Sequence, residues 1–218
     1  MAVAIENSLA YAYSGAAATT YTRSFTISGS DRYLLVSVVD VAGDTVTGVT
    51  YAGVSMTQLA KVAAATTRYT YMYGLANPTT GTNDIVASRS GTTSVFGYAA
   101  INLSGANQTT SPIDASATNN VTSATPTIDL TTVTDNSAVI VGAHTPNNPI
   151  AASTNLTEVV GDASFDVSIM ARSSTFPKTP AGAQTYTLTC PSGNTGLIAV
   201  SIAPPASTTV NSGFFMFM

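Results

Sequence analysis

One histidine, His144, and one cysteine, Cys190, are the chain's only examples of the side chains most often used as catalytic base and thiol nucleophile. A Ser-His-Asp triad also needs a positioned serine, and the sequence has no Gly-x-Ser-x-Gly elbow to supply one. A histidine metal site needs more ligands than this chain offers. We therefore expect no catalytic residue, no metal and no cofactor, with His144 a polar residue at a strand end and Cys190 a buried, inert thiol.

Two loose pairs of carboxylates, Asp40 with Asp44 and Asp162 with Asp166, could each form a Ca²⁺ loop, since hard oxygen ligands suit that ion. Neither pair matches an EF-hand. The alternative is that these are turn aspartates whose oxygens accept hydrogen bonds from backbone N–H groups. We favour the turn interpretation and leave weak Ca²⁺ binding open.

Three tyrosines, Tyr69, Tyr71 and Tyr73, alternate along one predicted strand and therefore share a face. Aromatic rings with a polar edge can stack on sugars. The same alternation is typical of a core or a subunit contact, which we favour. The three residues are a candidate aromatic contact face.

The sequence ends with five large apolar residues after a polar spacer over 206–213. They are Phe214, Phe215, Met216, Phe217 and Met218. Burial of each would gain about 1.5–3 kcal/mol, so we expect this tail to dock on its own domain or on a neighbouring subunit, which we favour. We take it as the subunit contact.

Charged residues make up only 8% of the chain, against roughly 25% in ordinary soluble domains. The basic residues form no cluster, so nucleic acid is not an expected partner. No apolar run approaches the roughly 18 residues of a membrane span, and the N-terminus does not read as a secretory signal. Solubility must come from Thr, Ser, Asn and Gly.

β-rich runs recur every 8–14 residues between Gly, Pro, Asn and Asp, whereas helix-forming Glu and Lys occur twice each. The expected strands are 5–13, 21–27, 33–41, 46–51, 54–62, 67–75, 84–89, 94–103, 127–132, 137–143, 156–160, 165–175, 184–190 and 196–203. Residues 58–65 could instead form a helical turn. The pattern predicts an all-β, two-sheet antiparallel sandwich of jelly-roll type over 1–205, followed by the spacer and tail over 206–218. Two smaller sandwiches divided near 107–125 are the alternative.

Several stretches, taken in order, are similar to a known kind of domain. They are residues 32–38, 46–57, 73–82, 100–112 and 196–202, for example Arg32-Tyr-Leu-Leu-Val-Ser-Val. They resemble a β-sandwich domain of phage structural proteins and of bacterial surface or secreted proteins, over about residues 20–204. The resemblance implies a fold and no catalytic residue.

These observations lead to one expected function and two alternatives. We expect a non-enzymatic, self-assembling structural subunit on the exterior of a virus particle, as a phage decoration, fibre or capsid-surface protein. Its partners would be copies of itself and other virion proteins, and its location the virion surface or the extracellular space. The alternatives are a subunit of a cellular extracellular filament, joined through the tail, and a carbohydrate-binding adhesin module.

Overall fold

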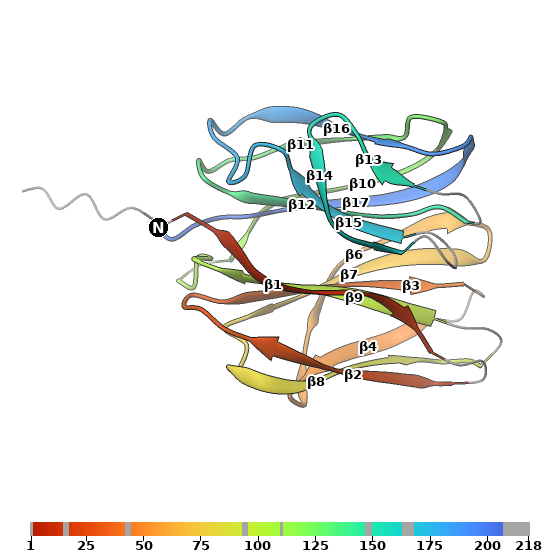
Figure 1. The fold of residues 1–218 in the computed structure, drawn as a ribbon, viewed down its shortest axis with the longest axis horizontal. Helices are drawn as coiled ribbons and strands as arrows, with labels where there is room; N and C mark the ends of the chain where they lie inside the picture. Colours follow the sequence, from red (N-terminus) through yellow and green to blue (C-terminus); the bar gives the residue numbers. More distant parts are fainter. Residues whose placement is uncertain are drawn as a thin grey trace, which may run out of the picture.

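The protein is built from β-strands stacked in four layers (Figure 1). The computed structural model describes residues 2–14, 18–41, 45–92, 96–109, 111–146, 150–162 and 168–206. Within these ranges there are strands β1 to β17 and no helix, and all strand pairs are antiparallel. The predicted all-β, antiparallel sandwich architecture is confirmed.

The first half of the chain forms two sheets. The first inner sheet consists, in spatial order, of β1 (Ala4–Tyr13), β9 (Phe96–Ser104), β3 (Tyr33–Asp40), β7 (Arg68–Ala76) and β6 (Thr57–Ala65). The first outer sheet consists of β2 (Thr20–Ile27), β8 (Gly81–Arg89), β4 (Val46–Tyr51) and β5 (Val54–Ser55). Apolar residues of the two sheets, among them Phe25, Val36 and Tyr71, form a core between them.

The second half forms two more sheets. The second inner sheet consists of β10 (Ile113–Ser123), β17 (Gly193–Ile202), β12 (Ala138–His144), β15 (Ser168–Ser173) and β14 (Leu156–Asp162). The second outer sheet consists of β11 (Thr127–Thr131), β16 (Ala183–Thr189) and β13 (Ala151–Ala152). A core that includes Val141, Tyr186 and Leu188 lies between these sheets.

The second half repeats the strand order of the first. In the inner sheets β10, β17, β12, β15 and β14 take the places of β1, β9, β3, β7 and β6, and in the outer sheets β11, β16 and β13 take those of β2, β8 and β4. In each half the first and last strands are neighbours and most successive strands alternate between sheets, which is a jelly-roll arrangement. The described strands thus form four sheets in two sandwiches, where we expected two sheets. The alternative division near 107–125 overlaps the connection from β9 to β10, which covers 105–112, and the assignment of 1–205 to one domain stays a prediction.

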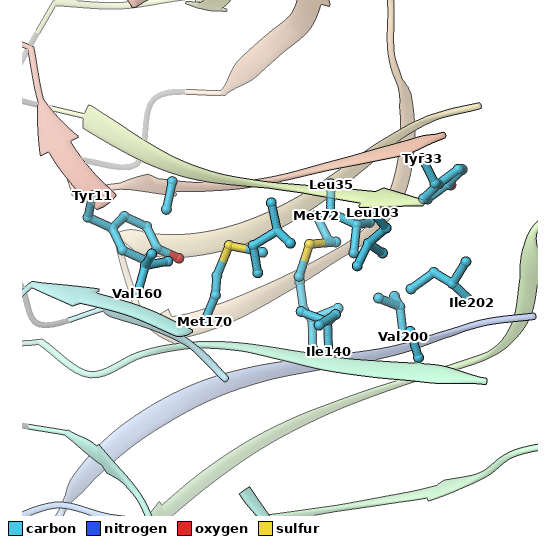
Figure 2. Packing of buried hydrophobic residues seen from close by; sticks show 14 of the residues in the cluster. Tyr11, Tyr33, Leu35, Met72, Leu103, Ile140, Val160, Met170, Val200 and Ile202 are labelled. Carbon is cyan, nitrogen blue, oxygen red and sulfur yellow. The ribbon is translucent and has the colours of Figure 1, made fainter. Parts of the chain in front are cut away.

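The two inner sheets pack face to face and share a central core. Figure 2 shows Leu35, Met72 and Leu103 of the first inner sheet meeting Ile140, Met170 and Val200 of the second. All six side chains are fully buried. The central core therefore holds the two halves together through apolar contacts.

The equivalence of the halves extends to single positions in the central core. Ser37 of β3 pairs with Met72 and Ala99, and Gly142 of β12 pairs with Met170 and Ile198. Ser37 and Gly142 are therefore equivalent positions. A Cβ atom on Gly142 would lie 3.2 Å from Ser37 Oγ and 2.8 Å from Met72 Cε, so the two positions face each other. This is the arrangement that an approximate twofold axis between the halves produces.

Asparagine side chains connect the first two strands of each half. Asn7 on β1 donates a hydrogen bond from Nδ2 to the carbonyl oxygen of Thr26 on β2, over 2.7 Å. Asn119 on β10 donates in the same way to the carbonyl oxygen of Thr127 on β11, again over 2.7 Å. These bonds join an inner sheet to the edge strand of the neighbouring outer sheet in both sandwiches.

Two segments test the strand predictions most sharply. Residues 58–65, for which a helical turn was the alternative, lie in strand β6 and pair with β7, so sheet contacts override the helix propensity of their alanines. Strand β10 was not predicted. From Ala115 onward its residues alternate between partly buried and exposed, and the partly buried set is Ala115, Ala117, Asn119, Val121 and Ser123, which gives little hydrophobic signal.

Candidate functional site

The exposed face of the first outer sheet is covered with hydroxyl groups. Residues at alternate positions of β2 point outward, and they are Thr20, Thr22, Ser24 and Thr26. Ser24 Oγ donates to Asp84 Oδ1 over 2.7 Å, and the hydroxyls of Thr26 and Thr82 are 2.8 Å apart. Cross-strand hydrogen bonds therefore order this hydroxyl face, and the carboxylate of Asp84 lies among its hydroxyls.

The second outer sheet presents a similar face at the opposite side of the stack. Its outward residues are Thr127, Asp129 and Thr131 on β11 and Thr185, Thr187 and Thr189 on β16. Thr185 Oγ1 donates to Asp129 Oδ1, which repeats the hydroxyl-to-carboxylate pair of the first outer sheet. A groove of about 340 Å³ runs beside this pair, lined by 129–131 and 183–185. Both outer faces can thus offer ordered hydroxyls to a partner. Because the faces carry little charge, contact with a partner removes water from few ions.

The three tyrosines of the candidate aromatic face lie on β7 and point toward the first outer sheet. Tyr71 and Tyr73 are 1% and 3% exposed and belong to the core between the first two sheets, while Tyr69 is partly buried against it. Burial raises the pKa of Tyr73 to about 12. The nitrogen of Lys61 lies 4.2 Å from the ring centroid of Tyr69 and 5.1 Å from that of Tyr71. The structure therefore places Tyr71 and Tyr73 in the core and Tyr69 against it, with Lys61 over the rings of Tyr69 and Tyr71.

His144 ends β12 and its side chain is fully buried toward the central core. Its strand neighbours are Ser168 on β15 and Gly196 on β17. Neither ring nitrogen has a hydrogen-bond partner within the described part of the chain. Burial, aided by the positive charge of Arg68, lowers the pKa of His144 to about 3. The imidazole is therefore neutral at ordinary pH, and its complete burial keeps it out of reach of a substrate.

Cys190 is also buried, with 5% of its surface exposed. Its Sγ lies 3.3 Å from the carbonyl oxygen of Ser123 and 3.8 Å from Thr195 Oγ1. No group of three or more His, Cys, Asp and Glu residues is placed to hold a metal ion within the described ranges.

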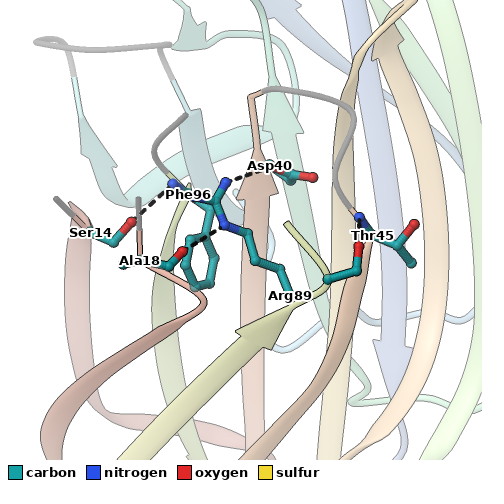
Figure 3. Close-up of polar contacts among 7 residues, drawn as sticks. Ser14, Ala18, Asp40, Thr45, Arg89 and Phe96 are labelled. Carbon is teal, nitrogen blue, oxygen red and sulfur yellow. Dashed lines mark hydrogen bonds and ion pairs between the residues drawn. The ribbon is translucent and has the colours of Figure 1, made fainter. Parts of the chain in front are cut away.

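Asp40 belongs to a buried ion pair. Its Oδ1 is 3.5 Å from Nη1 of Arg89, and both side chains are fully buried (Figure 3). Arg89 also donates from Nε to the carbonyl oxygen of Ala18 over 2.9 Å, and its guanidinium carbon lies 4.7 Å from the ring centroid of Phe96. Asp40 thus bonds a side chain from another strand. Asp44, Asp166 and the side chain of Asp162 lie outside the described residues, so both Ca²⁺ loops stay untested.

The predicted subunit contact at 214–218 lies outside the described residues, which end at Ala206. The structure does contain an apolar groove that was not predicted from the sequence. It has a volume of about 390 Å³ and lies between the start of β1 and the segment after β15, where Val3, Ile5, Phe176 and Pro177 line it. Its two walls are some 170 residues apart in the chain, so no local pattern could reveal it. The hydroxyl faces did have a signal, the alternating Thr and Ser at 20–26 and 185–189.

Comparisons with models of protein families, with curated proteins and with solved structures give no match. The resemblance to phage and bacterial surface domains therefore stays a prediction. Among the residues that the structure describes, no helix is long and apolar enough to cross a membrane.

Proposed function

We propose that this protein is a non-enzymatic structural subunit that assembles with copies of itself on the exterior of a virus particle. The observation that carries the proposal is the pair of outer faces, which lie on opposite sides of the stack and carry regular hydroxyls with little charge. Close packing of such faces costs little desolvation, because few ions lose water. The role would be that of a decoration, fibre or capsid-surface protein.

Three further features support a structural role. His144 is sealed in the central core and kept neutral, so it is a poor general base. The Asp40 carboxylate is engaged by Arg89. The apolar residues 214–218 provide a segment that would gain from burial on another molecule. The virus exterior itself rests on the sequence resemblance and on a composition that suits an extracellular surface.

Immunogold labelling tests the location. Antibodies against the purified protein should label the surface of particles released by lysis of the producing cells. Labelling of long cell-attached filaments without particles would instead identify a cellular filament, and would overturn the virion assignment.

Deletion of residues 211–218 tests self-assembly. The truncated chain should keep its β-rich circular dichroism but sediment as smaller species than the full chain. Identical sedimentation of the two proteins would show that assembly does not use the tail.

A carbohydrate-binding adhesin is the second candidate, and one observation favours it. The groove beside Asp129 and Thr185 combines a carboxylate with hydroxyls, which can bond sugar hydroxyl groups. Binding to a glycan array that is lost in Asp129→Ala would favour the adhesin. Absence of binding to every glycan on the array would count against the adhesin.

A further inference from the structure

The apolar groove at the start of β1 opens directly onto the central core. Val3 on its wall is 1% exposed and belongs to that core, and Ile5 and Phe176 pack against it. Ala4 lines the groove from an exposed position. We call this site the β1 groove. A groove continuous with a core offers an incoming side chain the same apolar contacts that hold the two halves together.

The described chain ends at the same end of the molecule as the start of β1 (Figure 1), and residues at the start of β1 line the groove. The amide of Asn107 donates to the carbonyl oxygen of Ala203 over 2.8 Å. Gly105, two residues before Asn107, is packed so closely that an added Cβ would lie 2.6 Å from the carbonyl oxygen of Ala2. The chain that leaves β17 is therefore close to the start of β1. Seven residues, 207–213, separate Ala206 from Phe214, so the eight steps between these two residues can span at most about 29 Å.

We infer that residues 214–218 of one copy bind in the β1 groove of a second copy, which rests on the self-assembly in the proposed function. The chemistry of the two surfaces matches. The groove offers the ring of Phe176 to the thioethers and rings of the segment, since sulfur and aromatic groups attract each other. The guanidinium carbon of Arg172 lies 5.3 Å from the Phe176 centroid, and this cation can also lie over an arriving phenyl ring.

The placement of the groove also determines the form of the assembly. Because the described chain ends at Ala206 near the start of β1, where the groove lies, two copies could exchange their segments reciprocally. Such an exchange uses the same surface on both molecules and closes into a pair. An open filament would instead need each segment to enter the groove of a copy that does not return its own segment. The contact therefore predicts closed pairs as the building unit.

Cross-linking between two variants of the full chain tests the contact directly. Ala4→Cys places a thiol on the groove wall, and Phe215→Cys places one in the segment. When the two variants are mixed and treated with a short bis-maleimide, a covalent heterodimer should form in several-fold higher yield than in a mixture of Ala10→Cys with Phe215→Cys. Ala10 is an exposed alanine of the same strand that does not line the groove. The unaltered protein, with Cys190 buried, gives the background.

Equal yields in the two mixtures would overturn the inference. So would a double variant, Ala4→Cys with Phe215→Cys, that cross-links only within one chain, because the segment would then bind its own groove. Sedimentation gives an independent check: Ala4→Glu should weaken the pair at least tenfold, while Ala10→Glu should leave it unchanged. These measurements use purified protein alone, so they can fail while immunogold labelling succeeds, or the reverse.

Discussion

His144 illustrates how burial controls the chemistry of one side chain. Its ring lies between the inner sheets, close enough to Arg68 for that positive charge to oppose protonation. A buried neutral imidazole without hydrogen-bond partners in the described structure costs stability, because water would otherwise satisfy its nitrogens. That cost becomes larger when the medium is acidic.

We expect acid to destabilise the protein through His144. In the unfolded chain His144 binds a proton near its ordinary pKa of 6.5, whereas in the folded protein the His144 ring stays neutral down to about pH 3. Stability due to the neutral ring is present above pH 6.5 and is lost as the pH falls toward 3. Between pH 6.5 and 4.5 the loss should be about 3 kcal/mol, at about 1.4 kcal/mol per pH unit. Urea unfolding at pH 7.5 and 4.5 measures it.

The control for this prediction is His144→Leu, which has no titrating group. The carboxylates of the protein still make the stability of this variant depend on pH. The difference between the two proteins therefore isolates the contribution of the histidine. An equal loss of stability in both proteins would contradict the assignment.

The Asp40–Arg89 pair makes a second residue-scale prediction. Arg89→Met keeps the apolar stem but leaves the buried carboxylate of Asp40 without its cation, and this should destabilise the protein by about 3–5 kcal/mol. Thermal unfolding measures the change. Arg23→Met, at a partly exposed arginine, is the matched control and should cost much less. A small effect of Arg89→Met would show that the ion pair contributes little.

Prediction of such contacts from sequence is limited by their separation along the chain. Alternation correctly put Tyr69, Tyr71 and Tyr73 on one face, but alternation alone does not say which face is inward. Asp40 and Arg89 are 49 residues apart, so nothing in the spacing of Asp40 and Asp44 pointed to an arginine.

At the scale of strands, apolar pattern was a good guide where both faces are buried. The run at 33–41 became β3 and the run at 137–143 became β12, both third in their five-stranded sheets and buried throughout. The signal failed for β10, an edge strand whose partly buried residues after Ile113 are small or polar apart from Val121. Other edge strands, among them β1 and β2, were predicted, so the sparse apolar residues of β10 hid it rather than its edge position.

Gly142 on β12 should be intolerant of a larger side chain. Gly142→Val would place its Cβ within 2.8 Å of Met72 Cε and add two methyl groups beyond it, so overpacking should cost about 1–3 kcal/mol. Gly48→Val on β4 is the control, since a Cβ there meets nothing within 4 Å. Chemical denaturation compares the two, and equal effects would mean that the inner sheets can move apart freely.

At the scale of the molecule, the sequence indicated the class of fold but not the number of sheets. Each run predicts a strand from neighbouring residues, whereas membership of a sheet depends on pairing across long stretches, such as β1 with β9 or β10 with β17. The repeated strand order was equally hidden, because the two halves share a pattern of pairing and few residues.

The shared central core should make the two halves unfold together. Separation of the halves would expose Leu35, Met72, Ile140 and Met170, along with the rest of that core, to water. Differential scanning calorimetry should therefore show one transition, and Val38→Ala, a change in the first half only, should lower its midpoint as a whole. Two separable transitions would contradict this coupling.

The bonds from Asn7 to Thr26 and from Asn119 to Thr127 have a consequence for behaviour at high concentration. A chain with 8% charged residues has weak electrostatic repulsion to keep molecules apart. Its exposed strand edges would then be templates for edge-to-edge growth into amyloid-like ribbons. Because an amide side chain occupies a carbonyl of β2 and another occupies one of β11, these edges are partly blocked from that growth. Two asparagines thus help an almost uncharged β-protein to remain dispersed.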